Sequence, residues 1–185
     1  MEFKYFFTAD LHLDHFEMIQ HCQRPFSSVE EMNEHLIVQW NKVVMPQDVV
    51  IHCGDFGLGL KWQMEPFKKR LNGNAIFIKG NHDHWMKEKR YEYHKKFNFP
   101  TILYVYATHF PLRTWVKDNI NGYNLHGHCH GSLAPFYNQL DVGIDNVNRI
   151  WGKYRPISLD EIHTQIQKQN SKIREGQNNE QGIFD

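Results

Sequence analysis

The sequence has no long hydrophobic run and no excess of charge of one sign. No apolar stretch approaches the roughly 20 residues that a helix needs to cross a bilayer. The first residues also lack the basic and apolar regions of a signal peptide. We therefore expect no membrane insertion and a cytoplasmic location. The 21 basic residues are balanced by 21 acidic ones, so the chain lacks the positive charge with which proteins bind long duplex nucleic acids.

Cysteine is scarce, and the spacing of the cysteines does not suggest disulfide pairs. The chain contains Cys22, Cys53 and Cys129, an odd number, and none of them belongs to a CxxC motif. This usage argues against a disulfide framework and indicates buried thiols in a reducing compartment.

The length and polarity of the chain predict one domain followed by a tail. A chain of 185 residues with 41% hydrophobic residues can bury a single substantial core. From about Gln167 the sequence becomes polar, and residues 171–182 have almost nothing to bury. We therefore predict a domain over residues 1–166 and a frayed or disordered tail over residues 167–185.

Short runs of β-branched and aromatic residues alternate with segments of helical spacing. The pattern predicts strands at Phe3–Phe7, Val49–Cys53, Ala75–Ile78, Ile102–Ala107, Asn124–His126 and Leu140–Ile144. It predicts helices at Val29–Val44, at Trp62–Leu71 and after Ser158. The alternation at the start of the chain favours a largely parallel α/β sheet. The later strands, joined by Gly- and Asn-containing segments, are compatible with antiparallel pairing.

Histidine is the most unusual feature of the composition, with 13 copies, most of them in clusters with Asp, Asn or Gly. Five short polar clusters follow predicted strands, and in open α/β sheets ligands collect at strand ends. In an extended backbone, i and i+2 side chains point to the same side, so each Asp-x-His or His-x-His pair could reach one metal. The candidate ligands are Asp10, His12, Asp55, Asn81, His109, His128 and His130.

The chemistry of these seven side chains favours divalent metals bound by oxygen and imidazole nitrogen. Such a set suits Mn, Fe, Zn or Ni better than a thiolate-bound structural zinc, and we favour Mn. Seven ligands suffice for two ions if one carboxylate bridges them. A two-metal site generates hydroxide near neutral pH and holds the oxygens of a phosphoryl group during displacement. The sequence therefore predicts hydrolysis of a phosphate ester.

At these residues the sequence resembles the calcineurin-like metallophosphoesterase family. The family motifs DxH, GD, GNH[D/E], H and GHxH each occur once and in the family's order. The stretch from Asp141 to Glu161 is similar to small single-domain bacterial and phage members. The resemblance implies a four-layer α/β/β/α sandwich. It also implies one metal on Asp10, His12, Asp55 and His130, and a second on Asp55, Asn81, His109 and His128.

The resemblance further implies that His82 is not a ligand. The matching histidine in the family protonates the leaving oxygen or contacts a phosphate oxygen. Asp83 completes the same motif and is expected to orient a neighbour. Unlike the Ser/Thr protein phosphatases, the sequence continues after Asp55 with Phe-Gly-Leu-Gly, which argues against that activity.

Two arginines are candidate phosphate contacts, because guanidinium matches phosphate geometry through paired donors. These are Arg113, four residues after His109, and Arg24; surface ion pairing is the alternative for both. His15 either lines the pocket or starts a helix. His52 and His126 lie inside predicted strands, where core positions are more typical than metal ligation.

Three functions remain open at this point. The first is a phosphomonoesterase or phosphodiesterase for a small phosphate ester or nucleotide. The second is a nuclease for short or single-stranded nucleic acid. The third is a non-catalytic binding scaffold, which the intact His82 and ligand positions disfavour.

Overall fold

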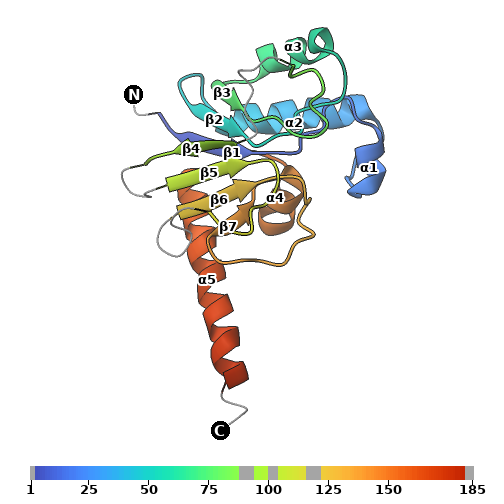
Figure 1. The fold of residues 1–185 in the computed structure, drawn as a ribbon. Coiled ribbons are helices and arrows are strands. Elements are labelled where there is room, and N and C mark those ends of the chain that lie inside the picture. The colour runs from blue at the N-terminus through green and yellow to red at the C-terminus, as the bar shows by residue number, and fades with distance from the viewer. Residues whose placement is uncertain (1–2, 88–93, 100–103, 116–121, 182–185) are drawn as a thin grey trace.

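The computed structural model describes residues 3–87, 94–99, 104–115 and 122–181. Within these segments, eight strands form two four-stranded sheets, each with parallel and antiparallel pairs (Figure 1). The first sheet has the order β3-β2-β1-β8. Its strands are β1 (Tyr5–Thr8), β2 (Val49–His52), β3 (Asn74–Phe77) and β8 (Ile157–Ser158). β1, β2 and β3 are parallel, so their carboxyl ends meet at one edge.

The second sheet has the order β4-β5-β6-β7. Its strands are β4 (His94–Phe97), β5 (Tyr104–Thr108), β6 (Gly122–His126) and β7 (Gln139–Asp141). β5, β6 and β7 are parallel, and only β4 is antiparallel to its neighbour. The expectation of antiparallel later strands was wrong. The segments that join β5, β6 and β7 are each about a dozen residues long, which is enough for a parallel crossover.

Helices flank the sheets. They are α1 (Glu17–His21), α2 (Val29–Val43), α3 (Lys61–Arg70), α4 (Ile144–Trp151) and α5 (Leu159–Gln181). Ser28 is the N-cap residue of α2, and its hydroxyl accepts the Glu31 N–H. The helix buries Met32, Leu36 and Trp40 at helical spacing. These side chains join a cluster with residues of β1, β2 and α3, so α2 and α3 cover the outer face of the first sheet (Figure 1). None of the helices in the described segments has the length and apolarity of a membrane span.

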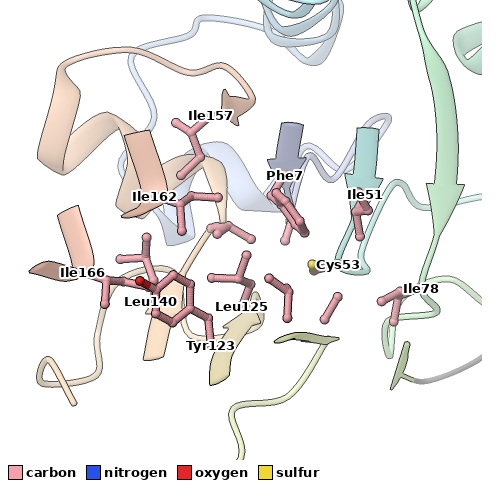
Figure 2. Close-up of a cluster of buried hydrophobic side chains, with 14 of the residues drawn as sticks. Phe7, Ile51, Cys53, Ile78, Tyr123, Leu125, Leu140, Ile157, Ile162 and Ile166 are labelled. Carbon is pink, nitrogen blue, oxygen red and sulfur yellow. The ribbon is translucent and has the colours of Figure 1, made fainter. Parts of the chain in front are cut away.

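A second cluster of buried side chains lies between the two sheets. Figure 2 shows Phe7 and Ile51 of the first sheet opposite Leu125 of the second, with Ile162 and Ile166 of α5 beside them. The inward faces of both sheets thus bury one another, and α5 closes the side of the cluster. The α/β class and the packing of two sheets flanked by helices are confirmed.

Several local differences separate the structure from the sequence prediction. The predicted strand Leu140–Ile144 divides into β7 and the start of α4, because Gly143 ends the extended run and becomes the N-cap residue of α4. Strands β4 and β8 and helices α1 and α4 had no sequence prediction. Residues 102–103 of the predicted strand Ile102–Ala107 lie outside the described residues.

The tail predicted from Gln167 begins inside a helix in the structure, and residues 182–185 lie outside the described residues. α5 continues without a break to Gln181 and extends beyond the sheets (Figure 1). Gln169 and Asn170 are buried. The Gln169 side-chain amide lies 2.7 Å from the carbonyl oxygen of Tyr137 and 2.9 Å from that of Gln139. Side-chain hydrogen bonds to β7 and to the segment before it therefore hold the helix in place past residue 166.

This contact predicts a stability change. Gln169→Ala leaves buried carbonyl oxygens without a donor, and we expect a loss of about 1–3 kcal/mol in the free energy of unfolding. Lys172→Ala is the matched control, because Lys172 is exposed on the same helix. Urea unfolding followed by circular dichroism measures both. Equal unfolding midpoints for the two variants would show that the Gln169 amide does not stabilise the fold.

Candidate metal centre

The predicted ligands gather beyond the carboxyl ends of parallel strands from both sheets. Asp10 and Asp55 follow β1 and β2 of the first sheet, and His109 and His128 follow β5 and β6 of the second. The loop that carries Asp10 is hydrogen bonded to the loop that carries Asp55, through Asp10 N–H to Gly54 O (3.0 Å) and His12 N–H to Asp55 O (3.1 Å). The site thus lies at one edge of the molecule, where the ends of both sheets meet.

Five of the seven candidate ligands have a left-handed backbone conformation, with φ between 48° and 70°; they are Asp10, His12, Asp55, His128 and His130. Such φ values are uncommon outside glycine, and each costs on the order of 1–3 kcal/mol. The pairs Asp10/His12 and His128/His130 are therefore not extended, contrary to the expectation from strand geometry. Tight turns, rather than strand alternation, direct these side chains inwards.

Glycine allows the backbone to approach the carboxylates closely. A Cβ at Gly127 would lie 2.8 Å from both carboxylate oxygens of Asp10. A Cβ at Gly80 would overlap the Asp55 carboxylate. Both contacts explain why these turns require glycine. The neighbouring His128 N–H then donates to Asp10 at 2.9 Å.

His109, Asn81 and Asp55 form a convergent group of acceptor atoms. His109 Nδ1 lies 3.0 Å from the carbonyl oxygen of Cys53, which only accepts, so Nδ1 carries the proton. In the neutral ring Nε2 then has a free lone pair. That nitrogen lies 2.7 Å from Asn81 Oδ1 and 3.3 Å from Asp55 Oδ2. With Nδ1 protonated, the lone pair of Nε2 faces these two oxygens, and His128 Nδ1 approaches Asn81 Oδ1 from another side at 3.0 Å.

His12 and Asp10 complete the buried floor of the centre. His12 Nε2 lies 3.6 Å from Asp55 Oδ2 and has no hydrogen-bond partner among the described residues. Burial lowers the pKa of His12 well below its usual value, so its ring is neutral. Burial and the nearby charge of Asp141 raise the pKa of Asp10 well above its usual value. Protein groups alone therefore leave the centre with unpaired lone pairs and crowded carboxylates.

Asp55 lies between the two halves of the group. Its Oδ2 faces both His12 and His109, while its Oδ1 accepts the His82 N–H at 2.8 Å. Burial opposes ionisation, but the His109 and His12 rings, when they carry a proton towards Asp55, and the His82 N–H hold the pKa of Asp55 below its usual range. Asp55 is thus an ionised carboxylate with one oxygen free to bind cations on two sides.

These features fit divalent cations. Lone pairs that converge without donors are stabilised by a positive ion, and buried carboxylates that repel one another lose that repulsion when cations bind. Oxygen and imidazole ligands match the preference of Mn, Fe and Zn. Two overlapping groups of potential ligand atoms share the site, Asp10-His12-His130 and Asp10-Asp55-His109.

The rim of the centre is open and rich in histidine. Asn81 and His128 are exposed, whereas Asp10, His12, Asp55 and His109 are buried. The His82 ring lies beside His12 and His15, with both centroid separations 5.1 Å. His15 Nδ1 lies 3.1 Å from His12 Nδ1. His15 therefore lines the site, which decides between the two interpretations that the sequence left open.

Arg24 requires a correction. The residue is only 3% exposed, and every guanidinium nitrogen is hydrogen bonded to protein groups. It donates to both carboxylate oxygens of Asp145, at 2.9 and 2.8 Å, and to the carbonyl oxygens of Leu11 and Asp10, at 2.9 and 2.8 Å. The fifth N–H, on Nη1, faces Met32 Sδ at 3.3 Å. Arg24 thus has no donor free for a phosphate, and the structure does not support its assignment as a phosphate contact.

The contact that the structure gives for Arg113 is with Phe136, not with a candidate ligand. Its side chain is exposed and packs over the ring of Phe136, with the guanidinium carbon 5.4 Å from the ring centroid. Its assignment as a phosphate contact stays a prediction.

Three further carboxylates support the ligand loops. Asp83 accepts N–H bonds from Gly80, Asp55 and Phe56 at 2.8 to 2.9 Å, so it orients two ligand loops as the sequence suggested. Asp141 accepts from the N–H groups of Gly131 and Gly143, both at 2.8 Å. Asp145 lies 2.7 Å from His130 Nδ1. The roles of Asp141 and Asp145 were missed, because only the folded chain brings them near the ligands.

Asp145 is ionised in this setting. Burial opposes its charge, but hydrogen bonds from His130 and Arg24 outweigh that effect and lower the pKa of Asp145 to about 2. Cys22 lies at the same place, with Sγ 3.3 Å from His130 Nδ1. Burial and the charge of Asp145 raise the pKa of Cys22 to about 12, so it remains a thiol.

A pocket of about 460 Å³ adjoins the centre beside two of the candidate ligands. Its lining is His21, Cys22, Gln23, His128, Cys129, His130, Ser132 and Asp145. The pocket gives the rim of the centre room for a group larger than phosphate.

Comparisons with known proteins agree with this description. A family model described as calcineurin-like phosphoesterase matches residues 3–174. MJ1445, an uncharacterized protein of Methanocaldococcus jannaschii, is 34% identical over 174 residues, which cover 89% of this chain and 92% of that protein. The crystal structure of AQ665, a protein of unknown function from Aquifex aeolicus, is similar with a TM-score of 0.65 at 20% identity, covering 89% of this chain and 100% of that one. The latter likeness concerns the fold alone.

Proposed function

Because the chain belongs to the calcineurin-like phosphoesterase family, we propose that it hydrolyses a small phosphate ester or nucleotide with the help of two divalent metal ions. The observation that carries this proposal is the convergence of His109 Nε2, Asn81 Oδ1 and Asp55 Oδ2 on one point, with the His128 ring beside them. His109 and Asp55 are buried, and lone pairs that converge in a buried place are stabilised by a cation. Such a group is expected where cations bind.

In this proposal Asp55 bridges the two ions. Asp10, His12 and His130 complete one ligand set, and Asn81, His109 and His128 complete the other. The position of Asp55 Oδ2 between His12 and His109 supports that division. Bound there, two divalent ions would lower the pKa of water and stabilise charge on the phosphoryl oxygens. We favour Mn, with Fe, Zn and Ni as alternatives, because the ligands are mixed oxygen and nitrogen.

The remaining residues bind and position the ester. His82 is half-buried at the rim, next to His12, where its ring can reach an ester oxygen above the centre. We assign it the transfer of a proton to the leaving oxygen. The open side at Asn81 and His128 admits the phosphoryl group, and the adjoining pocket can hold the substituent. No partner protein and no membrane contact is part of this proposal.

Reconstitution of metal-stripped protein tests the proposal directly. We expect about two equivalents of Mn per chain by elemental analysis, and hydrolysis that depends on added Mn, Fe, Zn or Ni. Bis-p-nitrophenyl phosphate and p-nitrophenyl phosphate separate diesterase from monoesterase preference, and short single-stranded oligonucleotides test for nuclease activity. Two bound metals without turnover of any ester would instead indicate a binding scaffold. One equivalent or less after reconstitution would contradict the bridged pair.

A further inference from the structure

Arg24 and Asp145 form a buried ion pair directly behind His130. The pair has paired donors and acceptors, with Nε to Oδ1 at 2.9 Å and Nη2 to Oδ2 at 2.8 Å. The Arg24 side chain is 0% exposed and that of Asp145 is 8% exposed. The two residues are 121 positions apart, so the pair joins the segment after α1 to the first turn of α4.

The Asp145 carboxylate determines which nitrogen of His130 carries the proton. Asp145 Oδ2 lies 2.7 Å from His130 Nδ1, and a carboxylate only accepts, so Nδ1 must donate. The lone pair of the neutral ring then lies on Nε2, the nitrogen that remains for a metal. The Cys22 sulfur also approaches Nδ1, but at 3.3 Å and as a weak partner. Asp145 is the stronger partner on both distance and charge.

Arg24 connects this carboxylate to the other ligands of the same group. Its Nη1 donates to Leu11 O at 2.9 Å and its Nη2 to Asp10 O at 2.8 Å. These carbonyl groups belong to the left-handed turn that carries Asp10 and His12. One guanidinium therefore binds the Asp10-His12 turn directly and the His130 ring through Asp145. It fixes the position of the turn relative to the ring. The three ligands form one of the groups that could hold a metal ion.

We infer that Arg24 and Asp145 are positioning residues that set the tautomer of His130 and its place beside Asp10 and His12. The inference rests on the proposed metal centre but does not require turnover. Outer partners of metal-binding histidines fix the ring and its tautomer, and their loss typically lowers metal affinity about 10–100-fold. In this chain the outer partner is itself held by a buried arginine that also holds a second ligand turn.

The first test needs no variant in the ion pair. In metal-free protein with ¹⁵N-labelled histidine rings, long-range ¹H–¹⁵N correlation spectra report the tautomer of each ring. His130 is assigned by the signal that His130→Gln removes. We expect a protonated Nδ1 and an unprotonated Nε2 for His130. The opposite tautomer would overturn the inference.

The second test measures binding of Mn²⁺ to variants by isothermal titration calorimetry. Asp145→Asn has the same shape, but its amide can donate to Nδ1 and so permits the other tautomer. We expect this variant to bind one of two Mn²⁺ equivalents about 10–100-fold more weakly, with the second equivalent unchanged, and to show the altered tautomer. Unchanged affinities in the folded variant would overturn the inference.

Two further variants control for simple loss of structure. Arg24→Lys keeps the charge but loses the paired geometry, so we expect the same equivalent to weaken while the Nδ1 proton stays in place. This variant decides the question if Asp145→Asn does not fold; unchanged Mn²⁺ binding by folded Arg24→Lys would then overturn the inference. Cys22→Ala removes the competing partner and should change neither tautomer nor affinity. A shift in Cys22→Ala like that expected for Asp145→Asn would assign the role to Cys22 instead.

Failure of the proposed function would be distinguishable. If the protein binds two Mn²⁺ with the expected tautomer but hydrolyses no ester, the positioning role stands and only the activity is wrong. If it binds no Mn²⁺, both proposals are wrong.

Discussion

Asp55→Asn is expected to lower the turnover of phosphate esters at least about 100-fold, because several kcal/mol of charge stabilisation correspond to two or more powers of ten. The structure explains why so small a change matters. The His82 N–H binds Asp55 Oδ1 at 2.8 Å, so the amide oxygen of the variant takes that place. The NH2 group must then face His12 and His109, where it cannot bind a cation. Metal content is expected to fall from about two equivalents together with turnover.

Asp14→Asn is the matched control for this experiment. Like Asp55, Asp14 is an aspartate in the left-handed conformation, with φ 59°. It follows the candidate ligand His12 by two residues. It is exposed, however, and its carboxylate binds the Asn33 amide at 2.7 Å. Metal content and turnover should stay at the parent values. Replacing His12, which faces one side of Asp55 only, should cost less than Asp55→Asn. Equal and mild losses at positions 55 and 12 would show that Asp55 is not the bridge.

The second large effect concerns His82 and depends on the leaving group. General acid catalysis is typically worth about 10²–10⁴-fold and matters most when the leaving alkoxide is a strong base. His82→Ala should therefore slow hydrolysis of alkyl or ribose-type esters by about that factor. It should slow p-nitrophenyl esters much less. The variant keeps the backbone N–H that holds Asp55, so metal content should remain that of the parent.

The result separates three roles for His82. Equal slowing of both ester classes with metals retained would mean that His82 stabilises charge on the phosphoryl oxygens rather than donating a proton. Loss of metal would place it among the ligands. His84→Ala is the control, because His84 is an exposed histidine two residues further along the same turn. It should leave the rates with both ester classes unchanged.

Local sequence rules predicted much of this protein. Short apolar runs located β1, β2, β3 and β6 to within a few residues, because strand residues must bury one face or both. The helical spacing of the segment Val29–Val44 located α2, which buries Met32, Leu36 and Trp40 in the structure.

The clusters at Asp10 and Asp55 follow strands in the sequence itself, so their meeting was predictable once β1 and β2 were taken as parallel. The approach of His109 and His128 from the second sheet was not predictable in this way, because β5 and β6 were expected to be antiparallel.

The tertiary structure decided everything that depends on contacts between distant segments. Arg24 reads as a free cation in the sequence, but the fold places it against Asp145, 121 residues away, where its donors are all used. Gln169 reads as part of a polar tail, yet it is buried against carbonyl groups about 30 residues earlier. The left-handed turns at Asp10, His12, His128 and His130 are likewise invisible in residue type alone. The chemistry of a side chain limits which partners it can bind. Its burial and its actual partner depend on the folded chain, because close packing determines which of those partners lies within reach.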